Sequence, residues 1–291
     1  MIIQDNTFID NTAIRYGGAI RTHGDSFELE VCIDNVFENN VGLQGGAIYL
    51  GGTTEIYFEN NNFTNNGATS SGGAIALAQR STFNATNCIF SNNTAVSLGG
   101  SMYLMEYSGA TIDNSTLNYN FANTSGGAIY SEDMSSVSIS NSIINYNSAV
   151  TGGAMLFDSY ANISIINCDV SFNFANSTGG GISATDDGLL TLIDSTVYSN
   201  YALSGSGLWL EGTLDFDISN CFFKNNTAKS RGGGILIGDH SSGIISNSIF
   251  QNNSATYTGG GGVWIQDQAI AYVYNCSFTV SFIHFIFIIV Y

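Results

Sequence analysis

The chain repeats one pattern of apolar and polar positions almost from end to end. Each copy has a large apolar residue, an Asn three positions later, and then a Gly-Gly-small-aliphatic motif, and successive copies are 26 to 29 residues apart. The large apolar residues are Phe8, Phe37, Phe63, Phe90, Leu117, Ile144, Val170, Val197, Phe223, Phe250 and Phe278. The residues that close the glycine motif are Ile20, Ile48, Ile75, Met102, Ile129, Met155, Ile182, Leu208, Ile235 and Val263. A fixed period of this length, sustained over ten copies, predicts a solenoid.

Alternating apolar residues within each copy predict strands. Examples are Val137 with Ile139 before the large apolar residue, and Ile48 with Leu50 after the glycines. A third strand carries the large apolar residue itself, and no helical spacing is sustained. We therefore predict an all-β fold, a right-handed single-stranded parallel β-helix (pectin-lyase-like solenoid), with about ten coils of ~27 residues and three short strands per coil. Residues 1–279 belong to it, and residues 280–291 form an apolar tail outside the repeat.

Two columns of polar residues recur in register with the large apolar position. The first, which we expect to hydrogen-bond from coil to coil, is Asn11, Asn40, Asn66, Asn93, Asn120, Asn147, Asn173, Asn200, Asn226 and Asn253. The second lies three positions before the apolar residue and runs from Asp5 to Asn275. Because Asn tolerates left-handed backbone, both columns predict turns, and the Gly-Gly pairs predict a further bend.

The charge and the cysteines exclude several classes of protein. A net charge of −17 with only six Lys and Arg repels phosphate backbones, so we predict no nucleic-acid partner. Cys88, Cys168, Cys221 and Cys276 share one small-residue column but never occupy neighbouring copies. Copies two apart are separated by about 9.6 Å, which is too far for a disulfide. We therefore expect buried free thiols and no cofactor.

Both ends of the chain depart from the expected pattern of a capped solenoid. Residues 1–8 already lie inside a copy and contain no signal segment, so we expect that upstream coils and a secretion signal are missing. The apolar run 282–291 is shorter than the roughly 20 residues that span a bilayer, so no membrane insertion is predicted. For 280–291 three interpretations stay open: translated intron sequence, a truncated membrane anchor, or an apolar cap. Sequencing the transcript tests the first of these.

An outward-facing aromatic column is the main candidate for ligand binding. The residue between the aliphatic residue and its inward partner is aromatic at Tyr49, Tyr103, Tyr130, Trp209 and Trp264. Flat aromatic surfaces bind sugar rings or protein partners. The alternative is that Tyr and Trp simply suit strands and shield their neighbours.

A column of acidic residues follows this strand in the next turn. Its members are Asp25, Glu106, Glu132, Asp133, Asp158, Asp186, Asp187, Glu211, Asp239 and Asp267. Stacked carboxylates need either solvent or a hard cation such as Ca²⁺. The nonapeptide of calcium-binding β-rolls is absent from the sequence. We therefore expect a solvated acidic edge and no metal site.

Catalysis is the alternative function, because parallel β-helices also house polysaccharide lyases and hydrolases. Such chemistry needs paired carboxylates or a positioned base. The candidates are Asp186 with Asp187, Asp215 with Asp217, and His240 beside Asp239. Each also fits an ordinary polar turn or exposed strand, and the sequence predicts no catalytic residue and no enzyme.

Two motifs together resemble a known repeat family. The chain contains Gly-Gly-Ala-Ile at 17–20, 45–48, 72–75 and 126–129, and Phe-x-x-Asn at 37–40, 90–93 and 250–253. Over residues 8–278 it resembles the polymorphic outer membrane protein repeats of bacterial autotransporter adhesins and of protist surface proteins. The resemblance implies a right-handed β-helix at the cell surface or outside the cell, acting in adhesion or as a scaffold, with a protein or glycan of a cell surface or matrix as partner. Ten Asn-x-Ser/Thr sequons are consistent with a secreted glycoprotein.

Overall fold

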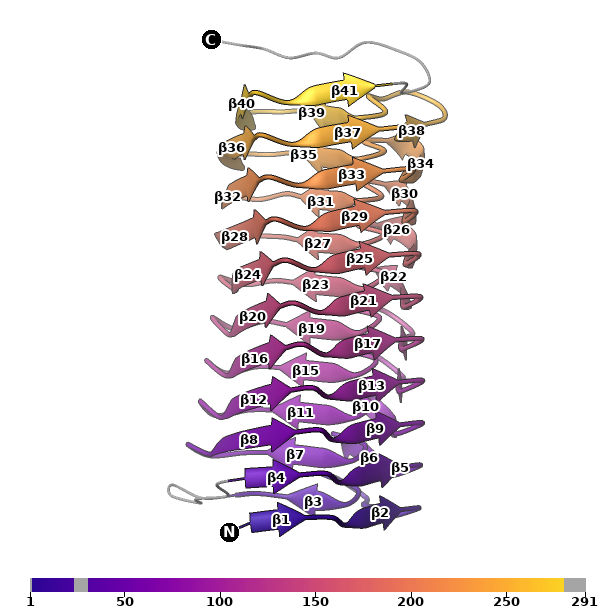
Figure 1. Ribbon diagram of the computed structural model, residues 1–291, viewed down its shortest axis with the longest axis vertical. Coiled ribbons are helices and arrows are strands. Elements are labelled where there is room, and N and C mark those ends of the chain that lie inside the picture. Colours follow the sequence, from indigo (N-terminus) through magenta and orange to yellow (C-terminus); the bar gives the residue numbers. More distant parts are fainter. Residues whose placement is uncertain (1, 24–30, 280–291) are drawn as a thin grey trace.

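The computed structural model describes residues 2–23 and 31–279. These residues form 41 short strands in four parallel sheets, and no helix is found among them. Most coils pass through sheets A, B, C and D in that order, and the sheets run along a straight rod with β1 (Ile2–Gln4) at one end and β41 (Ser277–Thr279) at the other (Figure 1). The predicted right-handed parallel β-helix is confirmed. The tail 280–291 and Asp25 lie outside the described residues.

Sheet A is an 11-stranded sheet that begins each coil. Its strands are β1 (Ile2–Gln4), β4 (Val31–Ile33), β8 (Glu55–Glu59), β12 (Thr82–Thr86), β16 (Gly109–Asp113), β20 (Ser136–Ser140), β24 (Asn162–Ile166), β28 (Gly188–Ile193), β32 (Leu214–Ser219), β36 (Ser242–Ser246) and β40 (Ile270–Tyr274). Alternate residues such as Val137 and Ile139 are buried, and those between them face outward.

Sheet B has 11 strands and carries the large apolar residues. Its strands are β2 (Thr7–Ile9), β5 (Val36–Glu38), β9 (Asn62–Thr64), β13 (Ile89–Ser91), β17 (Thr116–Asn118), β21 (Ile143–Asn145), β25 (Asp169–Ser171), β29 (Thr196–Tyr198), β33 (Phe222–Lys224), β37 (Ile249–Gln251) and β41 (Ser277–Thr279). Phe37 and Phe63 stack inside the coil with ring centroids 4.7 Å apart. That separation matches the spacing between neighbouring strands of a sheet, about 4.8 Å.

Sheet C is a nine-stranded sheet that the sequence pattern did not predict. Its strands are β6 (Val41–Gln44), β10 (Gly67–Ser71), β14 (Thr94–Ala95), β18 (Phe121–Ala122), β22 (Ser148–Thr151), β26 (Phe174–Thr178), β30 (Tyr201–Ser204), β34 (Thr227–Arg231) and β38 (Ser254–Ala255). Most coils therefore have four strands instead of three. The strands are short and turn only one small residue inward, such as Ala68 or Ala149, so they lack an apolar alternation.

Sheet D has ten strands and follows the glycine motif. Its strands are β3 (Ile20–Arg21), β7 (Ile48–Leu50), β11 (Ile75–Leu77), β15 (Met102–Leu104), β19 (Ile129–Ser131), β23 (Met155–Phe157), β27 (Ile182–Ala184), β31 (Leu208–Leu210), β35 (Ile235–Ile237) and β39 (Val263–Ile265). The glycines form the predicted bend before it. Gly99 has φ +61°, and a Cβ on Gly100 would lie 2.1 Å from the carbonyl oxygen of Gly127 in the next coil.

The predicted Asn column forms a continuous ladder inside the corner between sheets B and C. The Nδ2 of Asn120 donates to Oδ1 of Asn147 at 3.0 Å, and the same contact recurs from Asn11 to Asn253. The second column lies at the corner between sheets A and B, where all eleven residues from Asp5 to Asn275 have positive φ. At the B–C corner the left-handed residue is the one before the ladder Asn, for example Asn39 before Asn40. The ladder amides themselves are therefore not the turn residues that we expected.

The cysteines are free, as the column spacing predicted, and four of the five are buried. Burial raises the pKa of Cys88 and Cys168 from 9.0 to about 11, and that of Cys32 and Cys221 to about 12. In the same column, Ser115 accepts a hydrogen bond at Oγ from the Cys88 amide, 3.0 Å away. Cys and Ser are therefore structural equivalents in this column.

Candidate functional site

The predicted aromatic column faces outward from sheet D but is not an open stripe. Tyr49, Tyr103 and Tyr130 are 8%, 6% and 7% exposed, and Trp209 and Trp264 are half-buried. Tyr49, Tyr103 and Tyr130 pack in a second apolar cluster with Leu156, outside the main core, and Leu98 and Met105 pack against it. Little ring surface is left for a ligand, so the structure differs here from the flat aromatic surface that we expected.

The polar ends of these aromatic side chains reach the acidic turn between sheets D and A. The Tyr103 hydroxyl donates to Glu132, and the Tyr130 hydroxyl lies 3.2 Å from both Glu132 Oε2 and Asp158 Oδ2. The Trp209 Nε1 donates to Glu211 Oε2 at 3.1 Å. Burial, followed by the neighbouring carboxylates, raises the pKa of both tyrosines. Tyr103, Glu132, Tyr130 and Asp158 thus form one hydrogen-bonded network across neighbouring coils, whereas Trp209 bonds within its own coil.

The acidic turn does not gather a metal-ligand set. Among the described residues no group of three or more His, Cys, Asp or Glu is placed to hold a metal ion. The pKa of Asp186 is raised chiefly by its interaction with Asp158 of the preceding coil, and less by Asp187. Asp187 is the main cause of the raised pKa of Tyr160.

The other catalytic candidates lie in the open. Asp215 and Asp217 alternate along the exposed face of β32, and Asp215 Oδ1 accepts a hydrogen bond from the Ser242 hydroxyl at 2.9 Å. His240 and Asp239 are exposed in a turn, where the His240 amide donates to the Gly212 carbonyl. Among the described residues, His240 makes no hydrogen bond or ion pair with Asp215 or Asp217.

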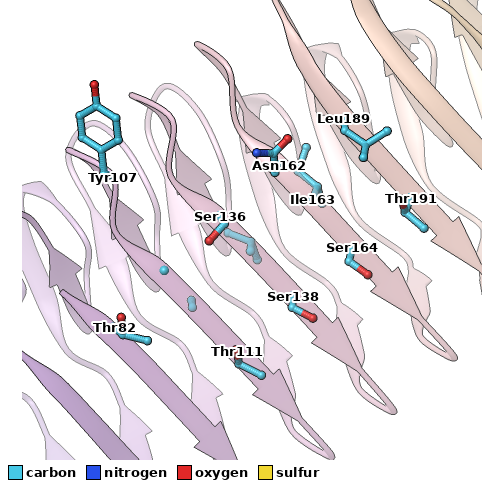
Figure 2. Close-up of a pocket in the computed structure, with 13 residues that line it drawn as sticks. Thr82, Tyr107, Thr111, Ser136, Ser138, Asn162, Ile163, Ser164, Leu189 and Thr191 are labelled. Atoms are coloured by element: carbon cyan, nitrogen blue, oxygen red, sulfur yellow. The ribbon is translucent and has the colours of Figure 1, made fainter. Parts of the chain in front are cut away.

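A shallow groove runs across the outer face of sheet A, and the sequence analysis missed it. It has a volume of about 440 Å³ and crosses five strands, from β12 to β28. Seven hydroxyl or amide side chains line it: Thr82, Thr111, Ser136, Ser138, Asn162, Ser164 and Thr191. Figure 2 shows Thr111, Ser138, Ser164 and Thr191 in one row on successive strands.

The parallel register arranges the groove side chains in two rows. The first row contains Thr82, Ser136, Asn162 and Leu189. Gly109 lies between Thr82 and Ser136 in this row and leaves a gap there. The second row is Thr111, Ser138, Ser164 and Thr191. Tyr107 rises from the turn beside the groove, is 56% exposed and has φ +63°. An extended ligand would therefore meet the same small polar groups at a constant interval of about 4.8 Å.

The polar side chains of the groove have no hydrogen-bond partners among residues 2–23 and 31–279. None of the seven donates or accepts a side-chain hydrogen bond to another described residue. By contrast, the buried Ser115 and Ser142 hydroxyls donate to the carbonyls of Asp113 and Ser140. The groove thus presents unused donors and acceptors. The signal was visible in the sequence as a run of outward Thr and Ser, but such residues also suit an ordinary solvated strand.

Charged groups lie at the ends of the groove and not along its lining. At one end of the groove, strand β8 carries Glu55 and Tyr57 in register with the two rows. At the other end, strand β32 carries Asp215 and Asp217 in register with them. Asp113, two residues beyond Thr111, accepts hydrogen bonds from Ser140 and Asn141, which lower its pKa. That carboxylate is therefore held ionised, and it is not suited to donate a proton.

Comparisons with known proteins agree with this architecture. The family model described as a right handed beta helix region matches residues 19–176 and 108–278. The search of curated proteins gave no match. The search of solved structures gave none either. No helix among residues 2–23 and 31–279 is long and apolar enough to cross a membrane. Because the two matched segments together cover most of the sequence, the chain belongs to the right-handed β-helix family.

Proposed function

We propose that this chain is a module of a cell-surface or secreted protein that binds a neutral glycan along the sheet A groove. It acts in adhesion or as a scaffold and carries out no reaction. The observation that carries the proposal is the set of seven groove side chains with hydroxyl or amide groups and no hydrogen-bond partner in the part of the chain that the structure describes. Sugar hydroxyls both donate and accept hydrogen bonds, so they match such a surface without needing a charge.

The shape of the groove favours a linear polymer over a compact ligand. Its two rows repeat the same kind of side chain on successive strands, at intervals of about 4.8 Å. Tyr107 and Leu189 are exposed apolar groups at its border, and they provide surface for the apolar faces of sugar rings. A neutral lining beside a chain of net charge −17 disfavours an acidic polysaccharide.

Display outside the cell is supported by the surface and by the resemblance to polymorphic outer membrane protein repeats. Eight of the ten sequon Asn residues are exposed, while Asn62 and Asn84 are half-buried. One exposed sequon, Asn162, lies in the groove. A glycan on Asn162 would fill the groove with the chain's own sugar, so the proposal needs that site to be unmodified.

A carbohydrate-active enzyme is the second candidate. Asp215 and Asp217 lie at the end of the groove, directly beside Leu189 and Thr191 in register. Residues two apart on one strand face have Cα atoms about 6.6 Å apart, which is near the carboxylate separation of inverting glycosidases. Both carboxylates are exposed, however, and Asp215 is bonded to Ser242.

Two measurements on one preparation of protein distinguish the two functions. The full chain, produced without N-glycosylation, is applied to an array of neutral and acidic glycans. Each glycan that binds is then incubated in solution with the same protein, and the mixture is analysed for new reducing ends and unsaturated uronates. We expect binding to neutral linear glycans and no product. Product that disappears with Asp215→Asn or Asp217→Asn would establish the enzyme instead. No binding to any neutral glycan would refute the groove proposal.

A further inference from the structure

The outer face of sheet C carries an exposed apolar patch. We define the sheet C patch as Phe121, Val150, Phe174, Tyr201 and Leu203, which are between 39% and 46% exposed. The register Phe121–Ser148–Phe174–Tyr201 places four of the strands side by side. No member is charged, and contiguous exposed apolar surface on a soluble protein is usually covered by a ligand or partner.

Two sequons lie within this patch. Asn123 and Asn176 are exposed, and each follows an exposed phenylalanine by two residues, in the segments Phe121-Ala122-Asn123 and Phe174-Ala175-Asn176. Because side chains alternate along a strand, each Asn emerges on the same outer face as its Phe, while Ala122 and Ala175 face the interior. The chain therefore places a possible sugar attachment point directly beside each aromatic ring.

The pairing of strand β26 (Phe174–Thr178) with its neighbours is irregular at Asn176. The register of strand β26 shifts against both neighbouring strands. Against β22 it shifts between Ala175 and Thr178, and against β30 between Phe174 and Thr178. Such a bulge leaves an extra residue unpaired and re-aims its side chain. Asn176 lies in this extra segment, and its side chain is exposed.

Phe174 has one ring face covered and one face free. Its ring stacks on Tyr201 with centroids 5.4 Å apart and planes 1° apart. The opposite face looks toward Ser148, and beyond Ser148 lies Phe121. Two strand spacings, about 9.6 Å, separate the Phe121 and Phe174 strands. A single pyranose ring at van der Waals distance, about 4 Å from each side, fits that interval.

We propose that Asn176 is an N-glycosylation site and that the first sugar of its glycan packs on the free face of Phe174, above Ser148. The glycan covers the sheet C patch. In the transfer, Asn176 Nδ2 forms a bond to the anomeric carbon of a lipid-linked oligosaccharide diphosphate. The carbon–oxygen bond to the diphosphate breaks, the diphosphate leaves, and one amide proton is released. The inference rests on the proposed display outside the cell, because this modification occurs on exported proteins.

The chain provides two sites for comparison. At Asn123 the sequon hydroxyl, Ser125 Oγ, lies 2.7 Å from the Thr151 hydroxyl, whereas the Thr178 hydroxyl of the Asn176 sequon has no hydrogen bond within the described protein. At Asn62 the sequon is closed: Asn62 is half-buried in β9, and its Oδ1 accepts a hydrogen bond from Thr64 at 2.6 Å. Of these three sequons, Asn176 is therefore the open one and Asn62 the matched closed one.

The first test measures occupancy. The full chain is directed through the secretory pathway of a eukaryotic host. The N-glycans are then removed enzymatically from its peptides in heavy-oxygen water, so that each occupied Asn becomes a labelled Asp. We expect occupancy at Asn176 at least tenfold above that at Asn62. An unoccupied Asn176 in protein that is glycosylated elsewhere overturns the proposal. Protein without any glycan shows that the chain is not a substrate for this machinery, which also overturns it.

The second test measures the contact with Phe174. Thermal unfolding is compared for the glycosylated protein and Asn176→Gln, each with Phe174 and with Phe174→Ala. Packing of the sugar on the ring predicts that the glycan raises the midpoint by about 2 °C when Phe174 is present and by less when it is Ala. An equal shift in both backgrounds refutes the packing. Glycan binding by the groove, measured on unglycosylated protein, is independent of both results.

Discussion

Asn147 is bonded both above and below in the buried amide ladder. Its Oδ1 accepts hydrogen bonds from the backbone N of Asn120 at 2.9 Å and from Asn120 Nδ2 at 3.0 Å. Its own Nδ2 donates to Asn173 Oδ1 and to the carbonyl of Leu117, which lies in the coil before it. One side chain therefore connects three consecutive coils.

Replacing this amide removes partners that have no replacement in the interior. We expect Asn147→Ala to lower the free energy of unfolding by about 2 to 4 kcal/mol, because it leaves several buried donors and acceptors unpaired. Urea unfolding followed by circular dichroism measures this. Asn145→Ala is the control, since Asn145 Oδ1 has no hydrogen-bond partner and its removal should change stability by less than about 0.5 kcal/mol. Equal effects would show that the ladder adds no stability.

Met134 has a backbone conformation that suits Asn better than Met. It is 48% exposed and has φ +58°, a left-handed conformation that costs a residue with a Cβ about 1 kcal/mol. We expect Met134→Asn to raise the unfolding free energy by up to about 1 kcal/mol. Met134→Ala, which keeps the Cβ, should have almost no effect. A stability of the Asn variant at or below that of the Ala variant would contradict the strain argument.

The buried thiols predict a loss of stability at alkaline pH. The pKa of Cys88 is raised in the folded protein from 9.0 to about 11 by burial, so above pH 9 the unfolded chain releases a proton that the folded chain keeps. Stability is complete below pH 9 and falls as pH rises toward 11, by about 1.4 kcal/mol per pH unit for each such thiol.

Ser provides the matched variant for this pH dependence. Ser115 and Ser142 occupy the same column as Cys88 and do not titrate in this range. We therefore expect Cys88→Ser to reduce the slope of unfolding free energy against pH between pH 9 and 11, with little change at pH 7. The same slope in both proteins would show that Cys88 does not contribute to the alkaline loss.

The groove hydroxyls should control glycan binding without controlling the fold. We expect Thr111→Val with Thr191→Val to weaken binding of a neutral glycan at least tenfold, the effect of losing about 1.4 kcal/mol of hydrogen bonding. Because the lining is uncharged, affinity should change little between 50 mM and 500 mM salt. Isothermal titration measures both. Asn84→Ala, whose side chain is outside the groove lining, is the control. Unchanged affinity in the double variant would place the ligand elsewhere.

The repeat register predicted much of the fold because each coil position has one dominant constraint. Phe37 and Phe63 must stack, Asn120 and Asn147 must pair, and Gly100 must admit a neighbouring backbone. Sheet C was missed because its strands place only a single small residue, such as Ala149, inside. Periodicity in apolar residues cannot report such a strand.

The candidate site was harder to predict because exposure depends on neighbouring turns. Tyr103 faces outward, as alternation predicts, but it packs with Tyr130 and Met105 and is only 6% exposed. Conversely, Ser138 and Ser164 are ordinary outward residues within one coil. They become a site only when the parallel register places them in a row. Sequence spacing gives orientation, whereas accessibility comes from the packed coils.

The two rows of the groove also set the length of ligand that it accommodates. Five strands at a spacing of about 4.8 Å extend over about 19 Å. Since each strand adds the same small side chains at the same interval, size selection depends on how many consecutive coils carry Ser or Thr at these positions. A whole coil inserted in register would lengthen the accepted chain by one strand spacing, without altering any existing contact between a side chain and a sugar.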